Sequence, residues 1–247
     1  MPSSTINYNE RMKINRYDTK QIVAHKFSEY FRDLTQTDQK IHIALSGGST
    51  PKIVFDELAA LYKDEINWKN VCFYWGDERC VVPTDNESNY KMTVTHLLSK
   101  ITIPEENIYR ILGENSPKEE AIRYSEVLAK ALPNVDGIPQ FDLVILGMGD
   151  DGHTASIFPH EIALWDSENN CEVAVHPDSG QNRVSITGKI INNAKTVAFL
   201  VTGAGKTKKV KEIIKKEGDF KSYPATFVAP KTKDLIWFLD EEAAAML

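Results

Sequence analysis

The stretch FDLVILGMGDDGHTASIFP, residues 141–159, joins a strongly apolar run to a glycine-rich turn. The apolar run, residues 143–146, is short and ends directly at GMGDDG, residues 147–152. Such a run is typical of a strand that is buried on both faces in a parallel sheet. The turn matches the G-x-G-x-x-G pattern of a dinucleotide-binding loop, yet His153 follows the third glycine at once. The stretch therefore indicates either a pyrophosphate loop or a turn that presents a catalytic histidine.

Similar apolar runs recur along the chain and alternate with segments of helical periodicity. They are IHIAL (41–45), VCFYW (71–75), VAFLV (197–201) and LIWFL (235–239). Apolar residues recur at helical spacing within 22–34, 54–62 and 210–214. The alternation predicts a doubly wound α/β fold, with a mainly parallel sheet and helices on both faces. No repeat or long linker interrupts the chain, so we expect residues 1–247 to form a single domain.

Composition narrows the class of protein and its partners. Hydrophobic residues make up 42% of the chain and the formal net charge is −6, which disfavours nucleic acid or an anionic membrane as partner. No leader-like apolar segment opens the chain, and no apolar run approaches the ~18 residues that span a bilayer. The three cysteines are widely spaced, which favours reduced thiols. We expect a soluble, cytoplasmic protein; its oligomeric state is not indicated.

The dinucleotide interpretation of the glycine turn is weak. That fingerprint needs a helix that starts at the glycines, but Pro159 limits such a helix to about two turns. A histidine at a strand end is chemically useful instead, because a neutral imidazole can accept a proton from water near pH 7. Asp151 lies two residues before His153 and could orient it. For His153 alone, a structural role such as capping Thr154 stays open. The spacings of common zinc sites are missing, so no metal is expected.

Ligands of doubly wound sheets bind beyond the carboxyl ends of the strands, so the loop ALSGGSTPK after residues 41–45 is a candidate anion site. Its glycines allow close backbone approach, a serine or threonine could cap the next helix, and free N–H groups at the helix start attract anions. An ordinary turn between strand and helix is the alternative. The candidate residues are Ser46, Gly47, Gly48, Ser49 and Thr50.

Two further loops carry basic residues. VTGAGKTKK ends like a Walker A motif, but the first glycine of that motif would fall at Leu200, so the P-loop interpretation fails. Lys206 at a helix start still suits a phosphate, although it could belong to a solvated lysine-rich face. WGDERC places Arg79 just beyond a strand end, where a neighbouring acid can orient it toward phosphate. A surface ion cluster is the alternative there.

Taken together, seven segments in order from Leu45 to Ala243 resemble the 6-phosphogluconolactonase family. They are LSGGSTP, WGDERCV, ESNY, FDLVILGMGDDGHTASIFP, RVSIT, FLVTGAGK and WFLDEEAA. SGGSTP alone is weak, because glucosamine-6-phosphate deaminases have a similar loop. Where those deaminases typically read GHIAFNEP, this chain reads GHTASIFP, and WGDER points to the lactonase branch as well.

The resemblance implies an enzyme of the oxidative pentose phosphate pathway that hydrolyses 6-phospho-D-glucono-1,5-lactone to 6-phosphogluconate without a required metal or cofactor. The family's catalytic histidine falls on His153, and its phosphate-binding basic residues fall on Arg79, Arg183 and Lys206. Asp150 stands where the family often has proline.

On this interpretation His153 activates water for attack on the lactone carbonyl. Backbone N–H groups near Gly149 to Gly152, or an arginine, would stabilise the oxyanion. Two alternatives remain: a glucosamine-6-phosphate deaminase, or a sugar-phosphate sensor without activity. A sensor usually needs a DNA-binding or partner domain, and the sequence shows no sign of one.

Overall fold

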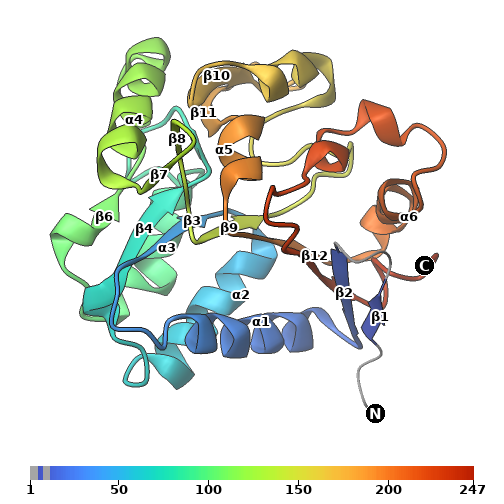
Figure 1. Ribbon diagram of the computed structural model, residues 1–247, viewed down its shortest axis with the longest axis horizontal. Helices are drawn as coiled ribbons and strands as arrows, with labels where there is room; N and C mark the ends of the chain where they lie inside the picture. Colours follow the sequence, from blue (N-terminus) through green and yellow to red (C-terminus); the bar gives the residue numbers. More distant parts are fainter. Residues whose placement is uncertain (1–4, 8–11) are drawn as a thin grey trace.

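The computed structural model describes residues 5–7 and 12–247. An eight-stranded sheet crosses the molecule in the order β1-β2-β13-β12-β9-β3-β4-β6 (Figure 1). Its strands are β1 (Thr5–Asn7), β2 (Met12–Tyr17), β3 (Ile41–Leu45), β4 (Val71–Trp75), β6 (Ile108–Tyr109), β9 (Leu143–Leu146), β12 (Thr196–Val201) and β13 (Leu235–Asp240). Neighbours from β2 to β6 pair in parallel, and β1 pairs antiparallel with β2. The mainly parallel sheet predicted from the apolar runs is confirmed.

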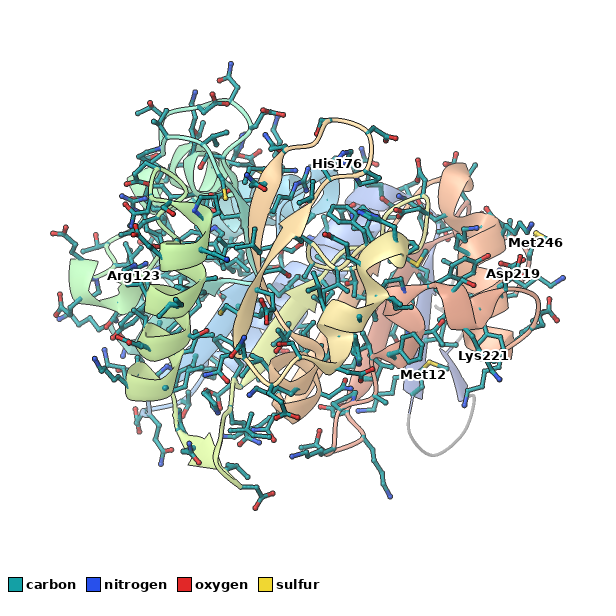
Figure 2. The ribbon with its side chains drawn as sticks, turned by 90° about the horizontal axis from the view of Figure 1, so that it is seen from above. Met12, Arg123, His176, Asp219, Lys221 and Met246 are labelled. Carbon is teal, nitrogen blue, oxygen red and sulfur yellow. The ribbon has the colours of Figure 1, made fainter. Side chains whose placement is uncertain are left out.

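Helices cover both faces of this sheet (Figure 1). On one face lie α1 (Lys20–Leu34), α2 (Ser49–Glu57) and α3 (Asn89–His96); on the other lie α4 (Pro117–Ala131), α5 (Gly188–Asn193) and α6 (Thr207–Lys215). Seen from above, α4 with Arg123 and the segment with Asp219 and Lys221 lie at opposite ends of the molecule (Figure 2). The doubly wound fold class is therefore confirmed.

The order of the strands in the main sheet predicts where a ligand should bind. From β3 the chain winds through β4 to β6 in one direction, and from β9 it winds through β12 to β13 in the other. Right-handed crossovers then put the two sets of helices on opposite faces. The direction reverses between the neighbouring strands β3 and β9, so the crevice beyond their carboxyl ends is the expected ligand site.

Burial explains why the main strands are so apolar. Every residue of β4, β9, β12 and β13 is buried, because helices cover both faces. β2 lies near the sheet edge with the mixed sequence MKINRY, of which Ile14 is buried.

A small antiparallel sheet stands beside the main one. Its order is β10 (Cys171–Val175), β11 (Asn182–Ile186) and β5 (Asp77–Arg79), and His176 follows β10 at the tip of the hairpin (Figure 2). β7 (Asn134–Val135) and β8 (Ile138–Pro139) form a further pair. Short 3-10 turns lie at Trp68–Asn70, Leu98–Lys100, Glu105–Asn107, Pro159–Asp166, Ala204–Lys206, Phe220–Ser222 and Pro224–Phe227, and a π-helical turn, Leu58–Tyr62, extends α2.

The start of α2 differs from the prediction. The helix begins at Ser49, and its N-cap is Gly48 with φ of 108°, so neither Ser49 nor Thr50 caps it. Glycine adopts this backbone conformation without the steric penalty of a Cβ atom. No helix of the described ranges 5–7 and 12–247 is long and apolar enough to cross a membrane.

Candidate active site

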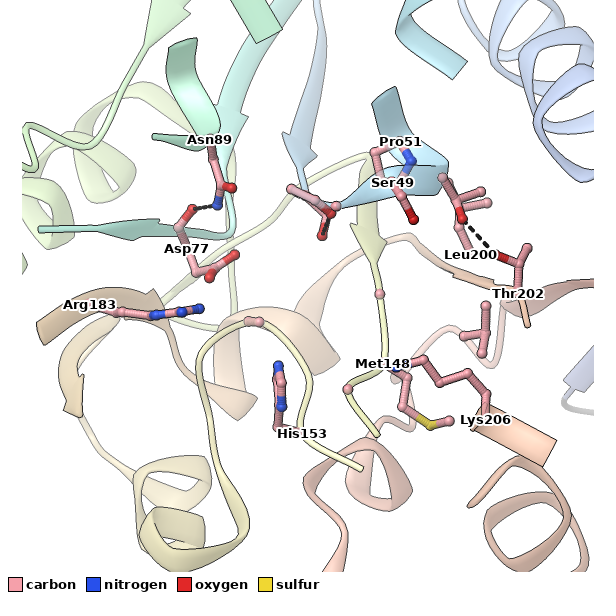
Figure 3. A pocket seen from close by; sticks show the side chains of 18 of the residues that line it. Ser49, Pro51, Asp77, Asn89, Met148, His153, Arg183, Leu200, Thr202 and Lys206 are labelled. Carbon is pink, nitrogen blue, oxygen red and sulfur yellow. Dashed lines mark hydrogen bonds between the residues drawn. The ribbon is translucent and has the colours of Figure 1, made fainter. Parts of the chain in front are cut away.

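A pocket of about 240 Å³ opens beyond the carboxyl ends of β3, β9 and β12, at the predicted crevice (Figure 3). It is lined by Ser46, Gly47, Gly48, Ser49, Thr50, Pro51, Asp77, Arg79, Asn89, Gly147, Met148, Gly149, His153, Ala155, Arg183, Leu200, Val201, Thr202 and Lys206. Every site residue predicted from the sequence lines this pocket except Asp151, which contacts it through His153. The fold thus brings together segments that are far apart in the chain, at residues 46–51, 77–89, 147–155, 183 and 200–206.

His153 is held in place by Asp151. The Nδ1 atom of His153 lies 2.6 Å from Oδ1 of Asp151, and the backbone N–H of His153 donates to the same oxygen at 3.0 Å. Burial raises the pKa of Asp151, but the hydrogen bonds and charge of His153 outweigh it and lower the pKa to about 2. The carboxylate is therefore ionised near neutral pH and can only accept, so Nδ1 carries the proton. When the ring is neutral, its Nε2 atom is left as a base.

The backbone around His153 supports this geometry. Thr154 donates through Oγ1 to the carbonyl of Gly147 at 2.9 Å, so it needs no cap from His153. Residues 153–158 form no helix, which confirms that the glycine turn does not start a dinucleotide-binding helix. Phe158 is fully buried, and its ring centroid lies 4.8 Å from that of His153. The buried ring of Phe158 at the end of the turn therefore packs beside the imidazole of His153 and supports it.

The glycine loop forms a second part of the pocket. The first N–H groups of a helix have no intrahelical partner, so the start of α2 presents donors to the pocket. A Cβ atom on Gly47 would lie 2.0 Å from Oδ1 of Asn89, which is why only glycine fits there. Thr50 is tied to the residue after β12 through a 2.9 Å hydrogen bond between its Oγ1 and that of Thr202. The loop thus resembles an anion-binding helix start more than an ordinary turn.

Two arginines face the same pocket from neighbouring strands. Arg79 on β5 and Arg183 on β11 are direct cross-strand partners. The Nε atom of each is buried and has no hydrogen-bond partner among the described residues. Burial lowers the pKa of Arg183; Asp77 opposes this shift and Arg79 adds to it. Buried, unpaired donors are unfavourable without a partner, so this pair is suited to an anionic ligand.

Lys206 reaches the pocket from the turn before α6. Its Nζ atom lies 2.5 Å from Oδ1 of Asp150. The neighbouring lysines have other partners, because Lys208 pairs with Glu212 and Lys211 with Glu217. The alternative that Lys206 belongs to a solvated lysine face is therefore wrong: Lys206 points into the pocket while those lysines line α6.

Asp77 and Asn89 also line the pocket, although the sequence alone indicated no role for them there. Asp77 is buried and accepts a 2.6 Å hydrogen bond from Oγ of Ser156, while Nδ2 of Asn89 donates to the backbone carbonyl of Asp77 at 3.0 Å. The segment ESNY, which contains Asn89, was the sequence pattern that could have indicated a site residue there.

The acid next to Arg79 acts differently from the prediction. Glu78 accepts from the backbone N–H groups of Arg79, Asn89 and Tyr90, each at 2.8 Å, rather than from a guanidinium. It also accepts from Oγ of Ser88 at 3.0 Å. Burial raises the pKa of Glu78, and these hydrogen bonds oppose that shift. Glu78 thus fixes the start of α3 against β5, and with it the position of Asn89.

Two of the backbone N–H groups expected as oxyanion donors are engaged within the turn. The N–H of Gly149 donates to the carbonyl of His153 at 2.9 Å, and the N–H of Gly152 donates to the carbonyl of Gly149 at 3.0 Å. The N–H groups of Gly149 and Gly152 thus close the turn on itself. The predicted oxyanion donor is then another N–H group of this turn or an arginine. Within the described residues, no three His, Cys, Asp or Glu side chains are grouped as they would be to hold a metal ion.

Comparison with known proteins places the chain in a family. A sequence model of the family described as glucosamine-6-phosphate isomerases/6-phosphogluconolactonase matches residues 15–237. The chain belongs to this family.

Within the glucosamine-6-phosphate isomerase/6-phosphogluconolactonase family, the chain is similar to proteins of the lactonase branch. It is 45% identical over 232 residues to the 6-phosphogluconolactonase of Haemophilus influenzae, covering 94% of this chain and 98% of that one. It is 44% identical over 195 residues to the 6-phosphogluconolactonase of Treponema pallidum, covering 79% and 81%. The solved 6-phosphogluconolactonase of Trypanosoma brucei superposes with a TM-score of 0.83 at 28% identity, covering 95% and 98%.

Proposed function

We infer that this protein hydrolyses 6-phospho-D-glucono-1,5-lactone to 6-phosphogluconate, the lactone-opening step of the oxidative pentose phosphate pathway. Its 45% and 44% identity to two named 6-phosphogluconolactonases, over 94% and 79% of the chain, supports the reaction. One observation carries the mechanism: His153, with Nδ1 bound to Asp151, lines the same pocket as Arg79, Arg183 and Lys206. A base and a cluster of cations in one pocket suit an ester whose far end is a phosphate dianion.

Phosphate binding is the first step of the proposed mechanism. The N–H groups at the start of α2, the two arginines and Lys206 supply positive potential around the pocket. Binding energy from the phosphate is used to orient the ring, so that the lactone carbonyl meets the imidazole.

Hydrolysis then follows at the carbonyl. Nε2 of His153 takes a proton from water as the water oxygen attacks C1, and Asp151 stabilises the resulting imidazolium. The tetrahedral oxyanion is stabilised by an arginine donor. As the bond from C1 to the ring oxygen breaks, the imidazolium returns its proton to that oxygen, and the acid product forms. The proton balance needs no metal and no covalent intermediate.

We also propose that the enzyme is cytoplasmic and forms a single domain. Its formal net charge of −6 disfavours nucleic acid or an anionic membrane as partner, and we propose a small phosphorylated lactone instead.

Two substrates separate the branches of the family. Freshly prepared 6-phosphogluconolactone should release acid faster with the enzyme than without it, whereas glucosamine 6-phosphate should release no ammonia. Ammonia release together with an unchanged rate of lactone hydrolysis would move the protein to the deaminase branch. Binding of sugar phosphates with no turnover of either substrate would make it a sensor.

A further inference from the structure

Asp150 and Lys206 form an ion pair at the mouth of the pocket. The two side chains differ greatly in exposure, since that of Lys206 is 21% exposed and that of Asp150 is 81% exposed. Lys206 lines the pocket and Asp150 does not. Figure 3 shows the Lys206 side chain extending along the pocket wall toward Met148. The pair therefore joins the turn that carries His153 to the element that presents the cation.

Two backbone donors just before Lys206 are already paired within the chain. The N–H of Gly203 donates to the carboxylate of Asp240 at 3.0 Å, and the N–H of Ala204 donates to Glu242 at 3.2 Å. Those backbone donors are thus already paired with acids of this chain. Lys206 has one acidic partner among the described residues, and this partner is largely in solvent.

The two neighbouring aspartates of the turn, Asp150 and Asp151, are held very differently. Asp151 is fixed by two hydrogen bonds to His153, whereas the contact with Lys206 is the one side-chain interaction of Asp150 within the described ranges. An exposed carboxylate with one partner moves into water at little cost. A phosphate dianion is an acceptor of the same kind for a lysine ammonium, and it carries more charge. Carboxylate and phosphate are therefore alternative partners for one ammonium group.

We propose that Asp150 sets the affinity of the pocket for phosphorylated ligands by competing with their phosphate for Lys206. The choice of ligand rests on the function proposed above, but the competition itself applies to any phosphate. Substrate and product carry the same phosphate, so Asp150 weakens the binding of both and speeds release of the product. Because ground state and transition state are affected alike, the effect falls on KM and leaves kcat nearly unchanged.

Asp150→Asn is the central variant of the test. Calorimetric titration with inorganic phosphate and with 6-phosphogluconate should give a Kd about two- to fivefold lower than that of the wild type, which is the range of an exposed ion pair. Asp64→Asn is the matched control, because this substitution removes the same charge at a site away from the pocket. Asp64 lies in an exposed turn beyond the C-terminal end of α2 and the π-helical turn that extends it. It should leave both Kd values unchanged.

A second pair of variants distinguishes competition between Asp150 and phosphate for Lys206 from direct repulsion of phosphate by Asp150. In a Lys206→Met protein, adding Asp150→Asn should not change the Kd for phosphate. An equal tightening in that background would overturn the proposal, because Asp150 would then repel phosphate directly. Unchanged or weaker phosphate binding in Asp150→Asn alone, or a wild type that binds no phosphate, would also overturn it.

Lactone turnover on the same samples separates this proposal from the proposed function. In Asp150→Asn, KM should fall by the same factor as the Kd and kcat should stay within about twofold. A wild type without lactonase activity would refute the proposed function, while the phosphate titrations would still decide whether Asp150 competes for Lys206.

Discussion

Asp151 Oδ1 accepts two hydrogen bonds from His153, one from its backbone N–H at 3.0 Å and one from Nδ1 at 2.6 Å. A single carboxylate oxygen thus fixes both the backbone and the ring of the residue two positions later. Since the ionised carboxylate cannot donate, the contact selects the tautomer that keeps the proton on Nδ1. The proposed role of His153 as a base on water depends on this contact.

Replacing Asp151 by asparagine should therefore impair the chemistry more than binding. An amide can donate to Nδ1 and favour the wrong tautomer, and it no longer stabilises an imidazolium. We expect Asp151→Asn to lower kcat by about 10²-fold or more, with KM within threefold. Steady-state kinetics on the phosphorylated lactone measure both constants. A variant with the kcat of the wild type would show that Asp151 does not tune the base.

Asp151 should also make the stability of the fold depend on pH in the acidic range. Its pKa is lowered in the folded protein to about 2, while an unfolded aspartate titrates near ~3.9. The stabilisation is therefore fully present above the unfolded value and is lost as pH falls toward 2. Urea unfolding at pH 5 and at pH 3 should show a larger loss of stability for the wild type than for Asp151→Asn. Equal losses would contradict the assigned pKa shift.

Arg79 should act through the phosphate of the substrate. Loss of a charged hydrogen-bond donor predicts that Arg79→Ala raises KM about 10- to 10²-fold, with a smaller change in kcat. Arg32→Ala removes the same charge from the last turn of α1, where Arg32 pairs with Glu65 instead of lining the pocket. This control should keep the KM of the wild type. Equal turnover of unphosphorylated gluconolactone by the wild type would refute the phosphate anchor.

Gly152 should tolerate no side chain. Its φ is 87°, and a Cβ atom there would lie 2.6 Å from Cβ of Tyr223, which is buried and hydrogen-bonded to Glu212. Strained backbone and overpacking together predict that Gly152→Ala is less stable by about 2–4 kcal/mol. Gly137 has a φ of 80°, and a Cβ atom added there would meet nothing within 4 Å. Gly137→Ala should therefore lower the free energy of unfolding only by the cost of the left-handed backbone, about 1–2 kcal/mol.

Urea denaturation of the two alanine variants measures the difference. Gly152→Ala should also lose activity, because the displaced turn carries His153, whereas Gly137→Ala should retain the kcat of the wild type. Equal stability of the two variants would show that the contact with Tyr223 does not constrain the turn.

How far the sequence predicts this structure depends on the kind of residue. The five apolar runs became strands because burial on both faces demands continuous apolar sequence, and the loops after them met because parallel strands end at one edge. β2 was missed because a strand near the sheet edge with one buried residue carries no such signal.

The contacts inside the site were harder to predict. The cap of α2 was misassigned because a glycine with positive φ can replace a side-chain cap. The paired arginines required the register of β5 against β11, two strands roughly a hundred residues apart in the chain. The roles of Asp77 and Asn89 likewise arise from tertiary contacts that no local pattern encodes.

The most direct test of the central claim is acid release in a pH-stat with freshly generated 6-phosphogluconolactone, corrected for spontaneous hydrolysis. Wild type, His153→Ala and His25→Ala would be compared, the last because His25 lies on α1 and pairs with Glu57 rather than lining the pocket. We predict that the wild type and His25→Ala accelerate hydrolysis equally. His153→Ala should have a kcat lower by about 10²–10⁴-fold with KM largely retained. A fall of less than threefold in His153→Ala would contradict the assignment of His153 as the base.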